Sequence, residues 1–95
     1  SNTHVSLLKN KKFGLFNLKT RKLIKPEYER NLQLLDKNHL VVFKDGFYGV
    51  MTNNEKKVTE FEFSEVKAWS DSVIWVKKNY QWMLLNFYSN KIELD

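Results

Sequence analysis

A short aromatic motif recurs along the chain at nearly constant spacing. Its three copies are Phe13-Gly14-Leu15, Tyr48-Gly49-Val50 and Trp82-Met83-Leu84. The aromatic residues of successive copies are 35 and 34 positions apart. An apolar run that ends in lysine precedes each copy, and a polar turn follows it. Such a period is typical of tandem repeats whose units bury their apolar faces against one another.

The repeated segments have the pattern of β-hairpins. In each copy an apolar run rich in β-branched and aromatic residues is followed by a two-residue polar turn and then by the aromatic motif. Downstream of the second hairpin, apolar and polar residues alternate over residues 58–64. This period of two predicts a third strand, with Phe61 and Phe63 on one face and Glu60 and Glu62 on the other.

The sequence therefore predicts an all-β fold of tandem β-hairpin or meander repeats. We expect one domain over residues 1–95, with units of roughly 4–38, 39–72 and 73–95, or about two and a half repeats. A short helical turn is expected over residues 31–36, whose sequence is NLQLLD. Neither end has the sequence of a capping unit, so we expect either part of a longer protein or an end-to-end assembly.

The repeated residues have predicted structural roles. Phe13, Tyr48 and Trp82 share a face with the aliphatic residue two positions later, and this layer is the expected core. Gly14 and Gly49 point to the opposite face, where a missing side chain lets another backbone or ring approach closely.

The hairpin turns differ in sequence. Asp45-Gly46 is a favourable turn dipeptide because glycine tolerates positive φ, whereas the equivalent positions hold Asn10-Lys11 and Asn79-Tyr80. We expect those two turns to be of a different type or slightly strained.

Three segments of the chain match the consensus of a known repeat. They are Ile24-Lys25-Pro26-Glu27-Tyr28-Glu29, the stretch VVFKDGFYGVM at residues 41–51, and Trp69-Ser70-Asp71-Ser72. Together they resemble the WG repeat, a tryptophan-glycine unit found in tandem in many bacterial proteins. The chain departs from the consensus because only Trp82 keeps the tryptophan, and Met83 follows it in place of glycine. The resemblance implies an all-β repeat fold used as a non-enzymatic interaction module, without catalytic residues. A rival resemblance, to the aromatic repeats of choline- and glucan-binding proteins, conflicts with the spacing because those units are shorter.

Several kinds of chemistry are not expected. The chain has no cysteine, which excludes disulfides, thiolate metal sites and a cysteine nucleophile. His4 and His39 are 35 residues apart and occupy equivalent positions, which favours a structural role over a catalytic or metal site. The glutamates at 60 and 62 fit the solvated side of a strand better than a pair of catalytic acids. We expect no enzyme activity, cofactor, metal or membrane span.

The basic charge bears on the choice of partner. The net charge is +5, but fourteen of the sixteen basic residues are lysine, whereas nucleic-acid surfaces favour arginine. Nucleic acid is therefore a disfavoured partner. Stacked repeats are expected to place the turn residues along one edge as a candidate binding surface. These residues are Lys11, Lys12, Lys44, Phe47, Lys77, Lys78 and Tyr80.

Two functions are compatible with such a surface. The favoured one is binding of a protein or peptide, acidic in character, through the repeat surface or by strand addition to an open edge. The alternative is electrostatic binding of an anionic polymer, either a nucleic acid or a cell-surface polymer, through the turn lysines. Open ends also favour self-assembly.

Overall fold

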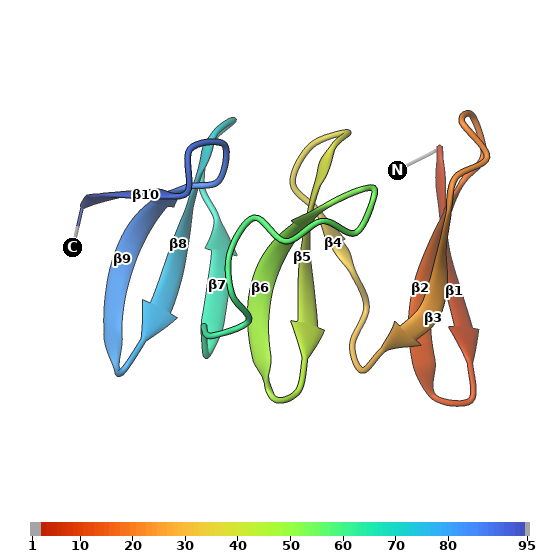
Figure 1. The fold of residues 1–95 in the computed structure, drawn as a ribbon, viewed down its shortest axis with the longest axis horizontal. Coiled ribbons are helices and arrows are strands. Elements are labelled where there is room, and N and C mark those ends of the chain that lie inside the picture. Colours follow the sequence, from red (N-terminus) through yellow and green to blue (C-terminus); the bar gives the residue numbers. More distant parts are fainter. Residues whose placement is uncertain (1–2, 95) are drawn as a thin grey trace.

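The computed structural model describes residues 3–94, and their regular structure is entirely β (Figure 1). The described strands are β1 (His4–Lys9), β2 (Lys12–Asn17), β3 (Leu23–Tyr28), β4 (Gln33–Leu34), β5 (His39–Lys44), β6 (Phe47–Thr52), β7 (Glu65–Ala68), β8 (Val73–Lys78), β9 (Gln81–Asn86) and β10 (Lys91–Leu94). They form a first sheet of order β1-β2-β3, a second of order β4-β5-β6 and a third of order β10-β9-β8-β7. Neighbouring strands are antiparallel throughout these sheets. The all-β repeat fold predicted from the sequence is confirmed.

The three sheets stand in a row along the long axis, with the first at the right of Figure 1 and the third at the left. The apolar core is divided between the two junctions of this row. The first cluster lies between the first and second sheets and contains Leu15, Ile24, Tyr28, Leu32, Leu40, Val42 and Met51. The second cluster joins the second and third sheets and contains Val50, Phe63, Ile74, Val76, Leu85 and Phe87. Each sheet thus buries a face against its neighbour, as in a repeat stack.

The second sheet is covered on both faces. Side chains alternate between faces along a strand, so Leu40 and Val42 of β5 reach the first cluster. Val41 points the other way and pairs with Val50, which belongs to the second cluster. Burial on both faces explains why residues 40–43 of β5 are an unbroken apolar run.

The helical turn expected over residues 31–36 is wrong. Gln33 and Leu34 form β4 instead, and they pair with Val41 and Leu40. A single helical turn fixes several backbone angles for one hydrogen bond. In the strand conformation, Leu34 instead pairs with the central strand and packs against the first cluster.

The third strand expected over residues 58–64 is also wrong. Within this segment, strand-like pairing with β6 is limited to an isolated bridge between Tyr48 and Phe63, and Lys57 just before it bridges to Met51. The N–H groups of Val58 and Thr59 both donate to the carbonyl oxygen of Val50, which interrupts the regular pairing. Third strands do follow the other two hairpins, as β3 and β10.

Strands cross the expected unit borders at residues 38/39 and 72/73. β4 and β7 precede these borders in the sequence but pair with β5 and β8, the first strands of the next hairpins. Each of the last two hairpins is therefore extended by a strand from the preceding unit, which ties successive units together.

The expectation that the hairpin turns differ in type is wrong. Both central residues have positive φ in all three turns, as type I′ turns require: 52° and 65° at Asn10-Lys11, 53° and 89° at Asp45-Gly46, and 52° and 65° at Asn79-Tyr80. The expected strain remains, because Lys11 and Tyr80 adopt a left-handed conformation that favours glycine.

Close approach at the repeated glycines is confirmed. A Cβ atom on Gly14 would lie 2.3 Å from the carbonyl oxygen of Ile24. On Gly49 it would lie 2.6 Å from the ring of Phe61. In the third copy Met83 takes this position, and its half-buried side chain packs against the second cluster.

Candidate binding surface

The outer face of the third sheet carries an unusual group of side chains. In the register of β8 and β9, Trp75 is opposite Leu84, and Lys77 is opposite Trp82. The alternate residues of these strands point into the second cluster, so this group lies on the face turned away from the second sheet. β7 adds Lys67, whose register partner is Trp75.

The tryptophans of this face surround a hollow of about 260 Å³, lined by Lys67, Trp69, Trp75 and Trp82. We call it the tryptophan hollow. The rings of Trp69 and Trp75 meet edge to face, with 5.9 Å between centroids and 74° between planes. Trp69 is 63% exposed and Trp82 is 38% exposed. All three tryptophans of the chain are thus gathered around one open hollow.

Two lysines set the charge of the tryptophan hollow. Lys77 Nζ lies 5.7 Å from the centroid of the Trp82 ring and 3.1 Å from Glu65 Oε2. Lys67 is part of the wall itself and has no ion-pair partner among the described residues. The hollow is therefore apolar, with the unpaired charge of Lys67 in its wall and the Lys77–Glu65 ion pair beside it.

The equivalent face of the second sheet is covered by the third sheet. By the repeat spacing, Trp75 and Trp82 correspond to Val41 and Tyr48. Val41 is only 3% exposed, and Tyr48 packs against the second cluster beside the third sheet. The tryptophan hollow is the counterpart of a face that the next sheet covers, yet it is open to solvent.

The predicted core layer of aromatic residues is only partly present. Phe13 and Tyr48 are half-buried at the borders of the two clusters. The expectation that Trp82 is a core residue is wrong, since its side chain is exposed in the tryptophan hollow. The three residues share one position in their hairpins, but burial at that position requires a following sheet.

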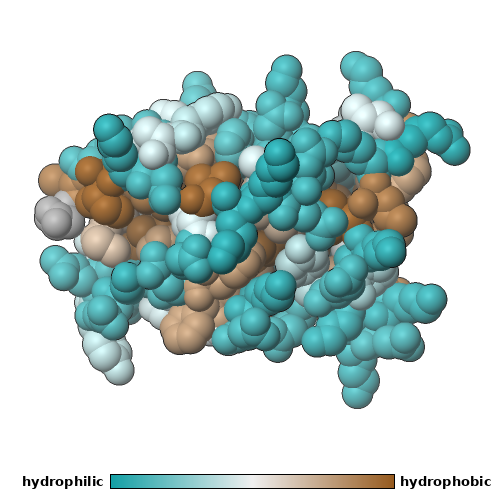
Figure 2. Space-filling model, in the orientation of Figure 1, coloured by the Kyte–Doolittle hydropathy of each residue, from teal (hydrophilic) through white to brown (hydrophobic). Residues whose placement is uncertain are grey.

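The turn residues of the predicted binding surface lie along one edge of the molecule, the lower edge in Figure 1. Lys11, Lys12 and Lys44 are exposed, as are Phe47 and Tyr80. Hydrophilic residues cover most of this edge in Figure 2. The structure thus brings the three turns to one side, at the opposite ends of the hairpins from the 18–22 and 87–90 loops.

Carboxylates interrupt the row of turn lysines. Lys78 Nζ is 2.7 Å from Glu62 Oε1, and Lys77 is paired with Glu65 as described. At the second turn, the N–H of Asp45 donates to Glu29 Oε1 over 2.9 Å. The edge is therefore mixed in charge.

The two histidines lie in different surroundings. His4 Nε2 is 3.3 Å from Asn17 Nδ2. His39 is buried, its Nδ1–H donates to Asp36 Oδ1 over 2.9 Å, and its ring lies 4.5 Å from that of Tyr88. No group of three or more His, Asp or Glu side chains in residues 3–94 is arranged to hold a metal ion.

Asp36 accepts several hydrogen bonds at the junction of the second and third sheets. Burial alone would raise the pKa of Asp36, but hydrogen bonds from the Tyr88 hydroxyl, the Asn38 N–H and His39 outweigh it and lower the pKa. The same Asp36 contact raises the pKa of the Tyr88 hydroxyl. This cluster connects the loop between β9 and β10, which holds Tyr88, to the loop before β5, which holds Asp36.

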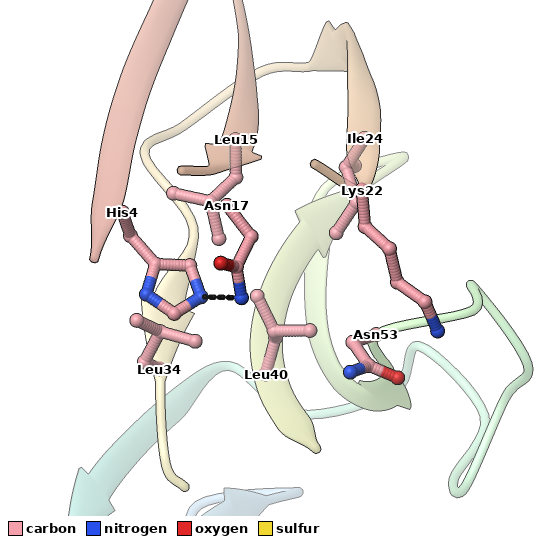
Figure 3. A pocket seen from close by; sticks show the side chains of 8 residues that line it. All are labelled: His4, Leu15, Asn17, Lys22, Ile24, Leu34, Leu40 and Asn53. Carbon is pink, nitrogen blue, oxygen red and sulfur yellow. Dashed lines mark hydrogen bonds between the residues drawn. The ribbon is translucent and has the colours of Figure 1, made fainter. Parts of the chain in front are cut away.

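A second, much smaller cavity lies between the first and second sheets (Figure 3). It encloses about 20 Å³, room for about one water molecule. Figure 3 shows His4 and Asn17 turned toward one another above Leu34 and Leu40, with Lys22 and Asn53 on the other side. Its leucine and isoleucine walls belong to the first cluster or pack against it, so this cavity is a gap in the packing.

Sequence reasoning singled out Trp82 of the tryptophan hollow but gave no surface role to Lys67, Trp69 and Trp75. One signal was present in the sequence: the repeat spacing places Trp69 and Trp75 at the positions of Leu35 and Val41. Replacement of aliphatic core residues by tryptophan in one copy indicates a face with a different environment.

Comparison with known families identifies the repeat. A family model described as "WG containing repeat" matches residues 48–82. Residues 48–82 are thus similar to the WG repeat. The matched segment begins at Tyr48 in β6 and ends at Trp82 in β9, so it links the second sheet to the third. No curated protein and no solved structure matches the chain. The described residues include no helix with the length and hydrophobicity of a membrane-spanning segment.

Proposed function

We propose that this protein is a non-enzymatic repeat module that binds a protein or peptide, and that the tryptophan hollow is its binding surface. The observation that carries the proposal is that a face equivalent to a stacking face is open and lined by three tryptophans. Large aromatic side chains in a solvent-accessible hollow are typical of the residues that dominate binding energy in protein interfaces.

The charge pattern favours this function over binding of an anionic polymer. Strong binding to a polyanion needs a continuous positive surface with several unpaired cations. Along the turn edge, Lys77 and Lys78 are paired with Glu65 and Glu62. The tryptophan hollow offers a continuous apolar surface for contact, whereas the turn edge is mixed in charge.

A peptide-display selection tests the function. The immobilised chain is used to select binders from a random library, and the selected peptides are measured against Trp69→Ala and Tyr80→Ala variants. Both side chains are exposed, so neither substitution should unfold the protein. Trp69 lines the hollow, whereas Tyr80 lies in the turn between β8 and β9.

We expect selected peptides to bind the Tyr80→Ala variant normally and the Trp69→Ala variant at least about tenfold more weakly. An apolar contact should hold its affinity between about 0.15 M and about 1 M salt, because screening acts on charge pairs. The proposal is contradicted if the selected peptides bind Trp69→Ala normally and lose affinity steeply with salt.

A further inference from the structure

The side chains that line the tryptophan hollow carry hydrogen-bond donors only. The polar side-chain atoms of its lining residues are the Lys67 ammonium and the indole N–H groups of Trp69, Trp75 and Trp82. Ammonium and indole groups donate and cannot accept. No hydrogen bond within residues 3–94 uses these three indole groups. A ligand that fits this wall must therefore bring acceptors and an apolar surface, without donors that would be left unpaired.

A proline-containing peptide has this chemistry. Each proline residue carries a backbone carbonyl and no N–H, so it is an acceptor without a donor. In the polyproline II conformation the backbone makes no internal hydrogen bonds, which leaves its carbonyls available to the indole groups. Proline rings supply apolar surface for packing against tryptophan. The conformation is also largely formed before binding, so less entropy is lost.

Lys67 adds a requirement for negative charge. It is in the wall without an ion-pair partner among the described residues, whereas the Lys77 ammonium near the face of Trp82 is already paired with Glu65. A cationic ligand would be repelled from this hollow, whereas a carboxylate next to the proline rings would meet Lys67.

Resting on the proposed function, we propose that the tryptophan hollow binds a segment of a partner protein that contains proline in the polyproline II conformation and an adjacent acidic residue. Trp69, Trp75 and Trp82 contact the proline rings and carbonyls. Lys67 contacts the carboxylate.

Other occupants fit the wall less well. Each hydroxyl of a sugar is both donor and acceptor, and the lining side chains have no acceptor to pair with its donors. A nucleic acid brings phosphates, but the wall offers one lysine.

The test uses the chain and a matched set of synthetic peptides, with binding measured by calorimetry and by shifts of the three indole N–H signals in NMR spectra. The parent peptide contains several prolines and one flanking glutamate. One variant replaces the prolines by alanine, and another replaces the glutamate by lysine. We expect the parent to bind and to shift the indole signals, and each variant peptide to bind at least about tenfold more weakly.

A charge reversal supplies the decisive control. The Lys67→Glu protein should bind the lysine peptide better than the glutamate peptide, which inverts the preference of the unchanged protein. The Lys19→Glu protein has the same change in net charge at an exposed site outside the hollow, and it should keep the original preference. Unchanged backbone spectra establish that each variant is folded.

The outcomes separate the two proposals. Equal binding of the alanine and proline peptides, or an unchanged charge preference in Lys67→Glu, overturns the polyproline inference while peptide binding stands. Binding of an oligosaccharide or single-stranded DNA at the hollow, with no binding by the parent peptide or by any displayed peptide, overturns both. Self-association that is lost in Trp69→Ala, without peptide binding, assigns the hollow to a second copy and also overturns both.

Discussion

Gly14 lies where the neighbouring strand β3 bulges toward β2, between the register pairs Phe13–Tyr28 and Leu15–Ile24. A Cβ atom there would be 2.3 Å from the Ile24 carbonyl oxygen and 2.7 Å from the Pro26 nitrogen. These neighbours are backbone atoms, which cannot move aside as the end of a side chain can. The sequence predicted this close approach, since a glycine that alternates with apolar residues in a strand indicates one.

Replacement of Gly14 by alanine should destabilise the protein by about 1–3 kcal/mol or more, because the added methyl group forces the two strands apart. Gly46→Ala is the matched control. Its Cβ would have no neighbour within 4 Å, and only the φ of 89° is unfavourable, which costs about 1 kcal/mol. Urea unfolding measures both. Equal losses in the two variants would mean that β3 does not approach Gly14 closely.

Asp36 makes stability depend on pH. Its pKa is lowered from the ordinary value of 3.8 in the folded chain, so the unfolded chain binds more protons at acid pH. The contribution of Asp36 is complete above pH 3.8 and is lost as the pH falls through the folded-state pKa.

The Tyr88→Phe substitution should raise the pKa of Asp36, because it removes the hydroxyl that donates to Oδ2. NMR titration of the Asp36 side-chain carboxyl carbon measures this shift, and thermal unfolding at acid pH should show a weaker pH dependence. Tyr80→Phe is the control, since Tyr80 is 95% exposed in a turn. An unchanged Asp36 titration in Tyr88→Phe would contradict the assigned cause.

At the scale of the element, the three hairpins share one turn geometry despite different sequences. Gly46 suits its positive φ, whereas Lys11 and Tyr80 adopt φ of 65° against the preference of their side chains. The strands on either side fix the turn, because six residue pairs align in each hairpin.

Lys11→Gly and Tyr80→Gly should each stabilise the protein by about 1 kcal/mol, as they relieve left-handed strain. Lys12→Gly, one position later at the start of β2, should instead destabilise it, because glycine loses more backbone freedom on folding than lysine does. Thermal unfolding compares the three variants. A loss of stability in both turn variants would show that the turns are not type I′.

Strand prediction succeeded where side chains of the same segment determine the structure. The hairpins and their shared register followed from apolar runs, turns and the repeat spacing. β4 and the irregular 53–64 segment did not follow, because both are set by contacts with a neighbouring strand and not by an alternating pattern of their own. Leu34 finds its pairing partner in Leu40, and Phe61 packs across Gly49. The alternation of apolar and polar residues within a segment indicates neither of these two contacts.

At the scale of the whole molecule, the core lies between sheets, and its position decides which repeated residues are buried. The sequence could place Phe13, Tyr48 and Trp82 at one position of the repeat. It could not indicate that Trp82 is exposed, because burial there depends on contact with another sheet and not on the position in the repeat. The tryptophan hollow was missed for the same reason.

Leu40→Ala should cost about 2–5 kcal/mol, because Leu40 is fully buried between the first and second sheets. Leu8→Ala removes the same atoms from a side chain that is 65% exposed, and it should change stability by less than about 0.5 kcal/mol. Chemical unfolding followed by fluorescence and circular dichroism measures both. Similar costs for the two substitutions would argue against this placement of the core.

The stacking of three sheets is tested most directly by NOE contacts between methyl groups in NMR spectra. The structure predicts that the Leu40 and Val42 methyls contact the first sheet at Leu15 and Ile24, while the Val50 methyls contact the third sheet. Methyl NOE contacts that join the first sheet directly to the third would contradict this order of stacking. So would Val50 methyls whose NOE contacts all lie within the second sheet.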